Sequence, residues 1–141
     1  MFHFEVRRTL PVSPEAIWAV ITNASLLQTG PFGISAIKGK IAPGETISLW
    51  SDASPGRAFK LKVTGFSPAS SMRWEGGLPF GLFWGVRKFT LTQTPQGCEF
   101  HMREDYSGLL SGLIRKSMPD LTPSFNTFAE ALAGHFQENN R

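Results

Sequence analysis

The sequence has few charged residues and almost no cysteine. Of its 141 residues, 18% are charged and 41% are hydrophobic, which excludes an acidic disordered tail or a long solvated helix. The one cysteine, Cys98, excludes an internal disulfide framework and a cysteine-rich zinc site. The longest nearly apolar run, residues 78–86, is too short to span a bilayer. The start of the chain lacks the pattern of a secretory signal, so we expect a cytoplasmic protein.

The positive charge is not concentrated in one place. The net charge is +3, but the basic residues occur as scattered pairs, such as Arg7 with Arg8 and Arg115 with Lys116. A nucleic-acid-binding protein usually gathers its basic residues in one stripe, so we expect no nucleic-acid partner. The three histidines are far apart and lack the spacing of metal ligands, so we predict no metal. No glycine-rich loop leads from a strand into a helix, so we predict no cofactor.

The chain is rich in aromatic residues, with 12 Phe, 4 Trp and 1 Tyr. Its length fits one domain that covers residues 1–141 and can bury a sizeable core. Alternating apolar residues predict a strand over residues 2–9, and turn residues divide the middle of the chain. Six further strands are predicted there, near 34–41, 45–51, 57–66, 70–76, 82–94 and 98–107.

Helices are predicted at both ends of this strand region. Ser13 and Pro14 are typical of a helix start, and a second short helix is expected to end at Gly30. A longer amphipathic helix is predicted after Thr122, because apolar residues recur on one face. The sequence therefore predicts an α+β fold, in which a curved antiparallel sheet of about seven strands wraps round a long C-terminal helix.

This order of elements and several sequence runs resemble the START-like superfamily, the helix-grip fold of SRPBCC proteins. The runs are WEGGLP at 74–79, GLF at 81–83, FTL at 89–91, REDYSGLL at 103–110 and PDL at 119–121, with Ser124, Phe125 and Phe128. They are most similar to small bacterial members described as polyketide cyclase/dehydrase-like. Many of these members carry Glu and His where this chain has Val86 and Met102, so roles at those positions do not transfer.

The resemblance implies an apolar cavity between the sheet and the C-terminal helix. Such pockets usually hold about 300–1,000 Å³. We therefore expect a small apolar ligand, such as a lipid, a polyketide-like molecule or an aromatic compound. The segments 76–83 and 30–34 are candidate gates. The expected ligand-binding residues are Arg87, Glu104, Tyr106, Trp74, Phe89, Met102, Phe83 and Phe128.

The last hairpin predicts how the polar members of this set are arranged. A two-residue turn at Gln96 and Gly97 would pair Glu104 with Phe89 and Tyr106 with Arg87. Glu104, Arg87 and Tyr106 would then share the inward face, with Glu104 and Arg87 as diagonal neighbours. The pair could either hold the sheet in register as a satisfied buried ion pair or orient a ligand at the cavity wall.

Two other functions remain open from the sequence. The first is a polyketide cyclase or dehydratase, in which Glu104 is the best candidate for the acid or base, and an Arg neighbour favours the base. The second is a protein-interaction module with a filled core and an exposed apolar patch around residues 78–83. We expect a ligand-binding protein rather than an enzyme, and a monomer or weak homodimer.

Overall fold

The computed structural model describes residues 1–52 and 54–139. Seven strands and four helices follow one another in the described part of the chain. In chain order they are β1 (Phe2–Leu10), α1 (Pro14–Ile21), α2 (Ala24–Leu27), β2 (Ile34–Lys38), β3 (Thr46–Ser51), β4 (Ser54–Ser67), β5 (Ser71–Leu78), β6 (Phe83–Thr94), β7 (Gly97–Ser107), α3 (Ser111–Ser117) and α4 (Thr122–Asn139).

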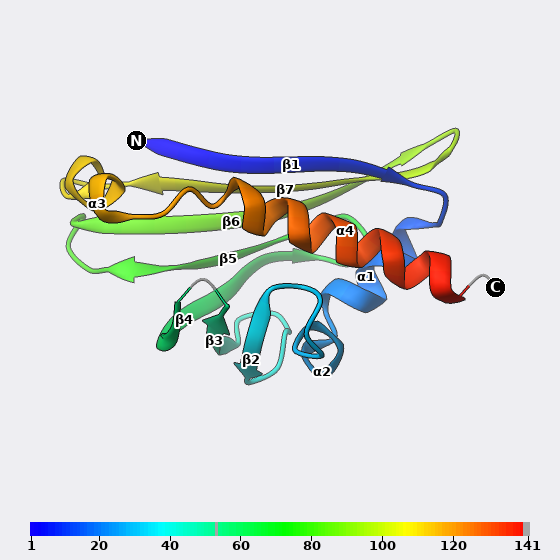
Figure 1. Ribbon diagram of the computed structural model, residues 1–141, viewed down its shortest axis with the longest axis horizontal. Helices are drawn as coiled ribbons and strands as arrows, with labels where there is room; N and C mark the ends of the chain where they lie inside the picture. The colour runs from blue at the N-terminus through cyan, green and yellow to red at the C-terminus, as the bar shows by residue number, and fades with distance from the viewer. Residues whose placement is uncertain (53, 140–141) are drawn as a thin grey trace.

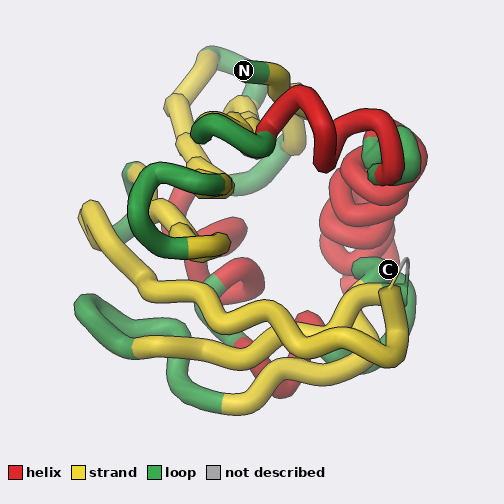
Figure 2. Tube along the Cα trace, turned by 90° about the vertical axis from the view of Figure 1, so that its left-hand side faces the viewer, coloured by secondary structure: helices red, strands yellow, loops and turns green. Residues whose placement is uncertain are grey.

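The strands form one antiparallel sheet in the order β1-β7-β6-β5-β4-β3-β2. The two short helices after β1 carry the chain to the opposite edge, from which consecutive strands return to β1. Helix α4 lies along one face of the sheet (Figure 1), and the sheet curls round toward it in the end view of Figure 2. The predicted α+β helix-grip fold is confirmed.

Local sequence signals explain where the first helices begin. The Ser13 side chain accepts a hydrogen bond from the Ala16 N–H at 3.2 Å, and the Asn23 side chain does the same for Leu26 at 3.1 Å. Such side chains satisfy backbone donors that have no partner within the helix. None of the helices in the described part of the chain has the length and apolar character that crossing a bilayer requires.

Aromatic rings fill much of the space between the sheet and α4. The Phe128 ring of α4 lies 6.1 Å from Phe89 and 5.9 Å from Phe100, measured between ring centroids. Trp74 meets Phe89 edge to face at 4.7 Å. All four of these side chains are fully or almost fully buried. They form the centre of the hydrophobic core.

The register predicted for the β6–β7 hairpin is wrong by two residues. Thr94 pairs with Gly97, so the turn consists of Pro95 and Gln96. Gly97 is the first residue of β7, and the place of its missing Cβ lies 2.1 Å from the Leu10 carbonyl oxygen, so no side chain fits there. A shift of two residues preserves the face of every side chain. The predicted inward face of β7 is therefore correct, but its cross-strand partners are not.

Candidate functional site

One transverse row of residues crosses the concave face of the sheet beneath the start of α4. Directly paired positions on five neighbouring strands form the row. Its members, from β1 to β4, are Phe4, Glu104, Arg87, Trp74 and Val63. The row thus places an acid, a guanidinium group and an indole side by side in an otherwise apolar setting.

Arg87 and Glu104 form an ion pair at the centre of this row. They are direct cross-strand partners rather than the predicted diagonal neighbours. Arg87 donates two hydrogen bonds to Oε1 of Glu104, from Nε at 3.2 Å and from Nη2 at 2.9 Å. The guanidinium group also lies over the Phe125 ring of α4, 4.9 Å from its centroid. The side chains keep only 20% and 13% exposure, so the pair is mostly desolvated while still reachable.

Tyr106 is the next inward residue of β7 toward α3. Its ring is stacked between Phe2 at 4.9 Å and Phe83 at 5.4 Å. Burial of the phenol raises the pKa of Tyr106 far above its usual value of 10, and the negative charge of Glu104 adds to this effect. Tyr106 therefore stays a neutral phenol at physiological pH. It can donate a hydrogen bond but cannot act as a base.

Trp74 contributes a buried donor that the described residues leave unpaired. The side chain is fully buried, and its Nε1 has no hydrogen-bond partner within residues 1–52 and 54–139. Buried polar groups nearly always have a partner, because an unpaired donor costs free energy. Trp74 is one of the ligand-binding residues expected from the sequence. The sequence contains no signal for the unpaired N–H, which depends on what the neighbouring strands place around it.

The predicted ligand-binding residues fall into two groups. Arg87, Glu104, Tyr106, Trp74 and Phe83 lie together from the row toward α3. A second group is completely enclosed in the core, beneath the middle of α4. It consists of Phe89, Met102 and Phe128. Contact between a ligand and any of these eight residues stays a prediction.

The end of the concave face nearest α3 keeps apolar surface in contact with solvent. Phe59 and Leu78 are exposed there, and Phe83 is half-buried. The positions between this end and the row are the paired glycines Gly76 and Gly85. The place of the missing Cβ of Gly85 lies 3.0 Å from the Tyr106 ring. Any larger residue at this position would have to displace the phenol.

The structure also shows a hollow of about 650 Å³ in a different place. It lies between the segment that joins α2 to β2 and the neighbouring side of α4. Its lining includes Leu26, Pro31, Phe32, Ala131, Gly134 and His135. The hollow borders the predicted gate at 30–34, but no residue of the Glu104 row lines it.

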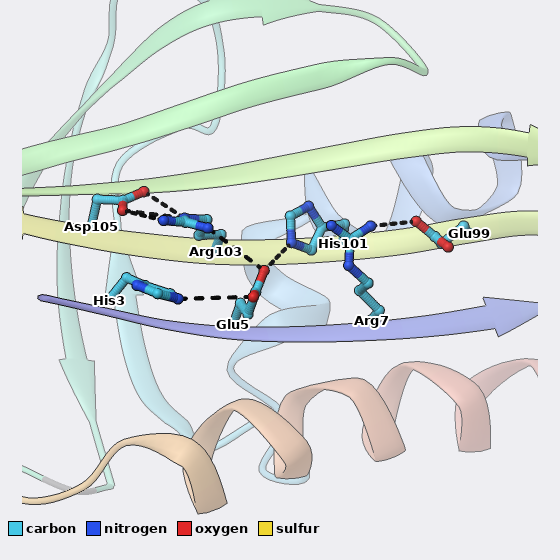
Figure 3. A network of polar contacts seen from close by, with 7 residues as sticks. All are labelled: His3, Glu5, Arg7, Glu99, His101, Arg103 and Asp105. Atoms are coloured by element: carbon cyan, nitrogen blue, oxygen red, sulfur yellow. Dashed lines mark hydrogen bonds and ion pairs between the residues drawn. The ribbon is translucent and has the colours of Figure 1, made fainter.

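The opposite, outward face of β1 and β7 carries a polar network (Figure 3). Glu5 lies at its centre, with the His101 Nε2 at 2.8 Å and the His3 Nε2 at 3.8 Å. Arg103 binds Asp105 at 3.0 Å in the same network. The hydrogen bond with His101 is the main cause that lowers the pKa of the Glu5 carboxyl. Across residues 1–52 and 54–139, no group of three or more His, Cys, Asp or Glu residues could hold a metal ion.

The comparisons with solved structures show the same fold. The chain is similar to protein MLL2253 from Mesorhizobium loti, with a TM-score of 0.76, 21% identity and coverage of 97% of this chain and 98% of that chain. It is similar to StfQ, the di-domain ARO/CYC protein of the steffimycin biosynthetic pathway, with a TM-score of 0.74, 14% identity and coverage of 98% and 51%. The Aha1 dimer from Colwellia psychrerythraea has a TM-score of 0.69, 17% identity and coverage of 94% of both chains.

The sequence itself identifies the family. None of the proteins of curated function matches this chain. The family model for polyketide cyclase / dehydrase and lipid transport matches residues 1–138, which is nearly the whole sequence. The resemblance to START-like proteins is thereby confirmed. The chain belongs to the polyketide cyclase / dehydrase and lipid transport family.

Proposed function

We propose that this protein binds a small apolar molecule that carries an acidic or carbonyl oxygen, between the sheet and α4. The observation that carries the proposal is the unpaired indole N–H of Trp74. The residue Trp74 is the cross-strand neighbour of Arg87, and the guanidinium group of Arg87 is mostly desolvated. The Trp74 N–H and the Arg87 guanidinium group are thus two donors on neighbouring strands, which suits a ligand oxygen that accepts from both. The bond from the guanidinium group would be charge-assisted and therefore strong.

The surroundings suit the rest of such a ligand. Tyr106 adds a neutral hydroxyl donor, and Phe83 with Leu78 offers apolar surface toward the α3 end. Pockets of this kind combine a mostly apolar lining with a few placed polar groups. The family description names polyketides and lipids, which are apolar molecules with oxygen functions. The segment 76–83 is the candidate gate at this end.

Turnover at the same site is a second candidate function. Glu104 lies against Arg87, and its charge acts on the neutral phenol of Tyr106, two residues along β7. This arrangement gives a carboxylate next to a proton donor, as general acid–base chemistry requires. A structural neighbour is an ARO/CYC protein of a polyketide pathway. A cyclisation or dehydration of a polyketide-like substrate would use Glu104 as the base.

A matched pair of fluorescent probes tests the binding proposal. Pyrenebutyric acid and pyrenebutanol have the same apolar ring system and differ in the terminal oxygen group. We expect the protein to prefer the acid. Arg87→Met should weaken acid binding by about tenfold to a hundredfold, the equivalent of losing one charge-assisted hydrogen bond. Binding of the alcohol should change much less.

Two further variants complete this experiment. Trp74→Phe keeps an aromatic ring but removes the N–H, and it should weaken both probes. Lys88→Met removes the same charge from the next residue of β6, which points to the outward face, and should leave both affinities unchanged. Equal losses in Arg87→Met and Lys88→Met would contradict the proposal. Glu104→Gln separates the two functions, because it should abolish turnover of an aldol-type polyketide substrate but retain binding if the protein is an enzyme.

A further inference from the structure

Three large apolar side chains at one end of the molecule extend into solvent. Phe80, in the turn between β5 and β6, is 93% exposed. Leu109, which lies just before α3, is 84% exposed, and Leu113, within α3, is 67% exposed. Figure 1 places the β5–β6 turn and α3 at the same end of the long axis. Single exposed apolar residues are ordinary, but a group on adjoining segments marks an interaction surface.

Backbone contacts hold these two segments together as one unit. The Leu109 N–H donates to the Gly81 carbonyl at 3.0 Å, and the Leu110 N–H donates to the Leu82 carbonyl at 2.8 Å. Phe80 has a φ of +61°, which is uncommon for a bulky residue. The backbone of Phe80 thus adopts an unfavourable conformation although its phenyl ring is exposed to solvent. Such conformations are found preferentially at functional positions.

The charged residues of the two segments that carry these side chains are all basic. Arg115 and Lys116 lie in α3 and are exposed, and the Arg115 guanidinium lies 5.3 Å from the centroid of the Phe2 ring. The segments 76–86 and 106–119 contain neither Asp nor Glu. The exposed apolar tips therefore adjoin a positive region of the surface. This combination of apolar and basic groups matches the anionic head-group region of a lipid bilayer.

We propose that Phe80, Leu109, Leu113, Arg115 and Lys116 form a docking surface for an anionic lipid bilayer. The three apolar side chains would insert at the level of the head groups, and the two basic residues would contact lipid phosphates. The contact is peripheral, since none of the described helices is suited to cross a bilayer. A stable protein partner usually covers a broad surface of about 800 Å². A few protruding side chains at the end of a molecule suit insertion into a bilayer better than such an interface.

Sedimentation with sucrose-loaded vesicles tests this proposal without any knowledge of the ligand. The vesicles contain either phosphatidylcholine alone or equal parts of phosphatidylcholine and phosphatidylglycerol. We expect binding to the anionic vesicles that falls as salt is added, and little binding to the neutral ones. Phe80→Asn with Leu113→Gln should lower the partition coefficient at least about tenfold, since each buried side chain contributes about that factor. Asn tolerates the positive φ at position 80.

A charge-reversed variant in α3 and a matched control elsewhere show whether vesicle binding depends on the position of the basic residues or only on the net charge. Arg115→Glu with Lys116→Glu should lower anionic binding at least about tenfold, because each basic residue near such a surface contributes about fivefold. Lys38→Glu with Lys40→Glu makes the same change in net charge at the β2 edge, and should lower it less than about threefold. Circular dichroism and thermal unfolding confirm that each variant is folded. Leu109→Gln repeats the apolar test if the first double variant does not unfold cooperatively.

Three results would overturn the proposal. The first is equal vesicle binding by the wild type and by the apolar variants. The second is an equal loss in the control pair at residues 38 and 40. The third is a wild-type protein that ignores both kinds of vesicle and instead forms a dimer, in sedimentation equilibrium, that the Phe80 and Leu113 substitutions abolish. Failure here leaves the ligand experiments with Arg87 and Trp74 unaffected, so the two proposals fail separately.

Discussion

Arg87 and Glu104 are direct partners across β6 and β7, and both hydrogen bonds of the guanidinium group converge on one oxygen, Oε1. Sequence alternation alone brings the two residues to the same face. Only the register makes them opposite each other, and α4 contributes the Phe125 ring that lies against the guanidinium group. A desolvated ion pair of this kind costs free energy when one partner is lost, because the remaining charge stays in an apolar setting.

Substitution of either partner should therefore destabilise the fold. Glu104→Gln or Arg87→Met should each lower the free energy of unfolding by about 2–3 kcal/mol. The double variant should lose less than the sum of the two, since no unpaired charge remains. Urea unfolding measures these differences. Arg103→Met, in an exposed ion pair on the outward face, should lose less than about 1 kcal/mol. Additive effects of the two inward substitutions would contradict the coupling.

Two glycines near the start of α3 should respond in opposite ways to alanine. Gly108 has a φ of +112°, and a Cβ there would lie 2.6 Å from the Leu82 carbonyl oxygen. Gly108→Ala should therefore cost about 2 kcal/mol or more. A Cβ at Gly112 would meet nothing within 4 Å, so Gly112→Ala should stabilise α3 by about 0.5–1 kcal/mol. Thermal unfolding compares the two, and a destabilised Gly112→Ala variant would refute the assignment of open space.

Two carboxyl groups should make the fold sensitive to acid. Hydrogen bonds from His101 to Glu5 and from Thr64 to Glu75 lower the pKa of each carboxyl below its usual 4.5. A lowered folded pKa contributes stability that is complete above the unfolded pKa and is lost as pH falls through the folded value. Wild-type stability should thus decline below about pH 4.5. In Glu75→Gln, the free energy of unfolding that is lost on acidification should be smaller than in the wild type, by less than about 1 kcal/mol, because the Glu75 carboxyl is partly exposed. Urea midpoints across this pH range provide the test, with Glu45→Gln as the control.

The thiol of Cys98 should be unreactive in the folded protein. The side chain is completely buried, and burial raises its pKa above the usual 9.0, so the reactive thiolate is scarce. Labelling by a disulfide reagent should be at least about a hundredfold slower in the native protein than in urea, because it requires opening of the structure. Rapid labelling of the native protein would show that the β7 end of the sheet opens readily.

The sequence predicted the architecture well because its local signals agree with the global fold. Ser13 and Pro14 define the first helix as expected, and alternating residues assign each inward side chain of β7 to the correct face. The register of the β6–β7 hairpin was predicted wrongly, because a period of two is unchanged by a shift of two residues. The observed register also brings Gly97 close to the Leu10 carbonyl of β1, a contact between residues distant in sequence.

Periodicity and punctuation in the sequence by themselves determined the order of strands and helices and, in the β6–β7 hairpin, the set of polar residues that points inward. The tertiary structure alone decided that Glu104 and Arg87 are opposite each other, that no described residue is a partner for the Trp74 N–H, and that Phe80, Leu109 and Leu113 lie at one end. The reason is physical. The face of the sheet on which a side chain lies depends on its position along the strand. Its cross-strand partner, its desolvation and its exposure depend on atoms that distant strands and helices bring together.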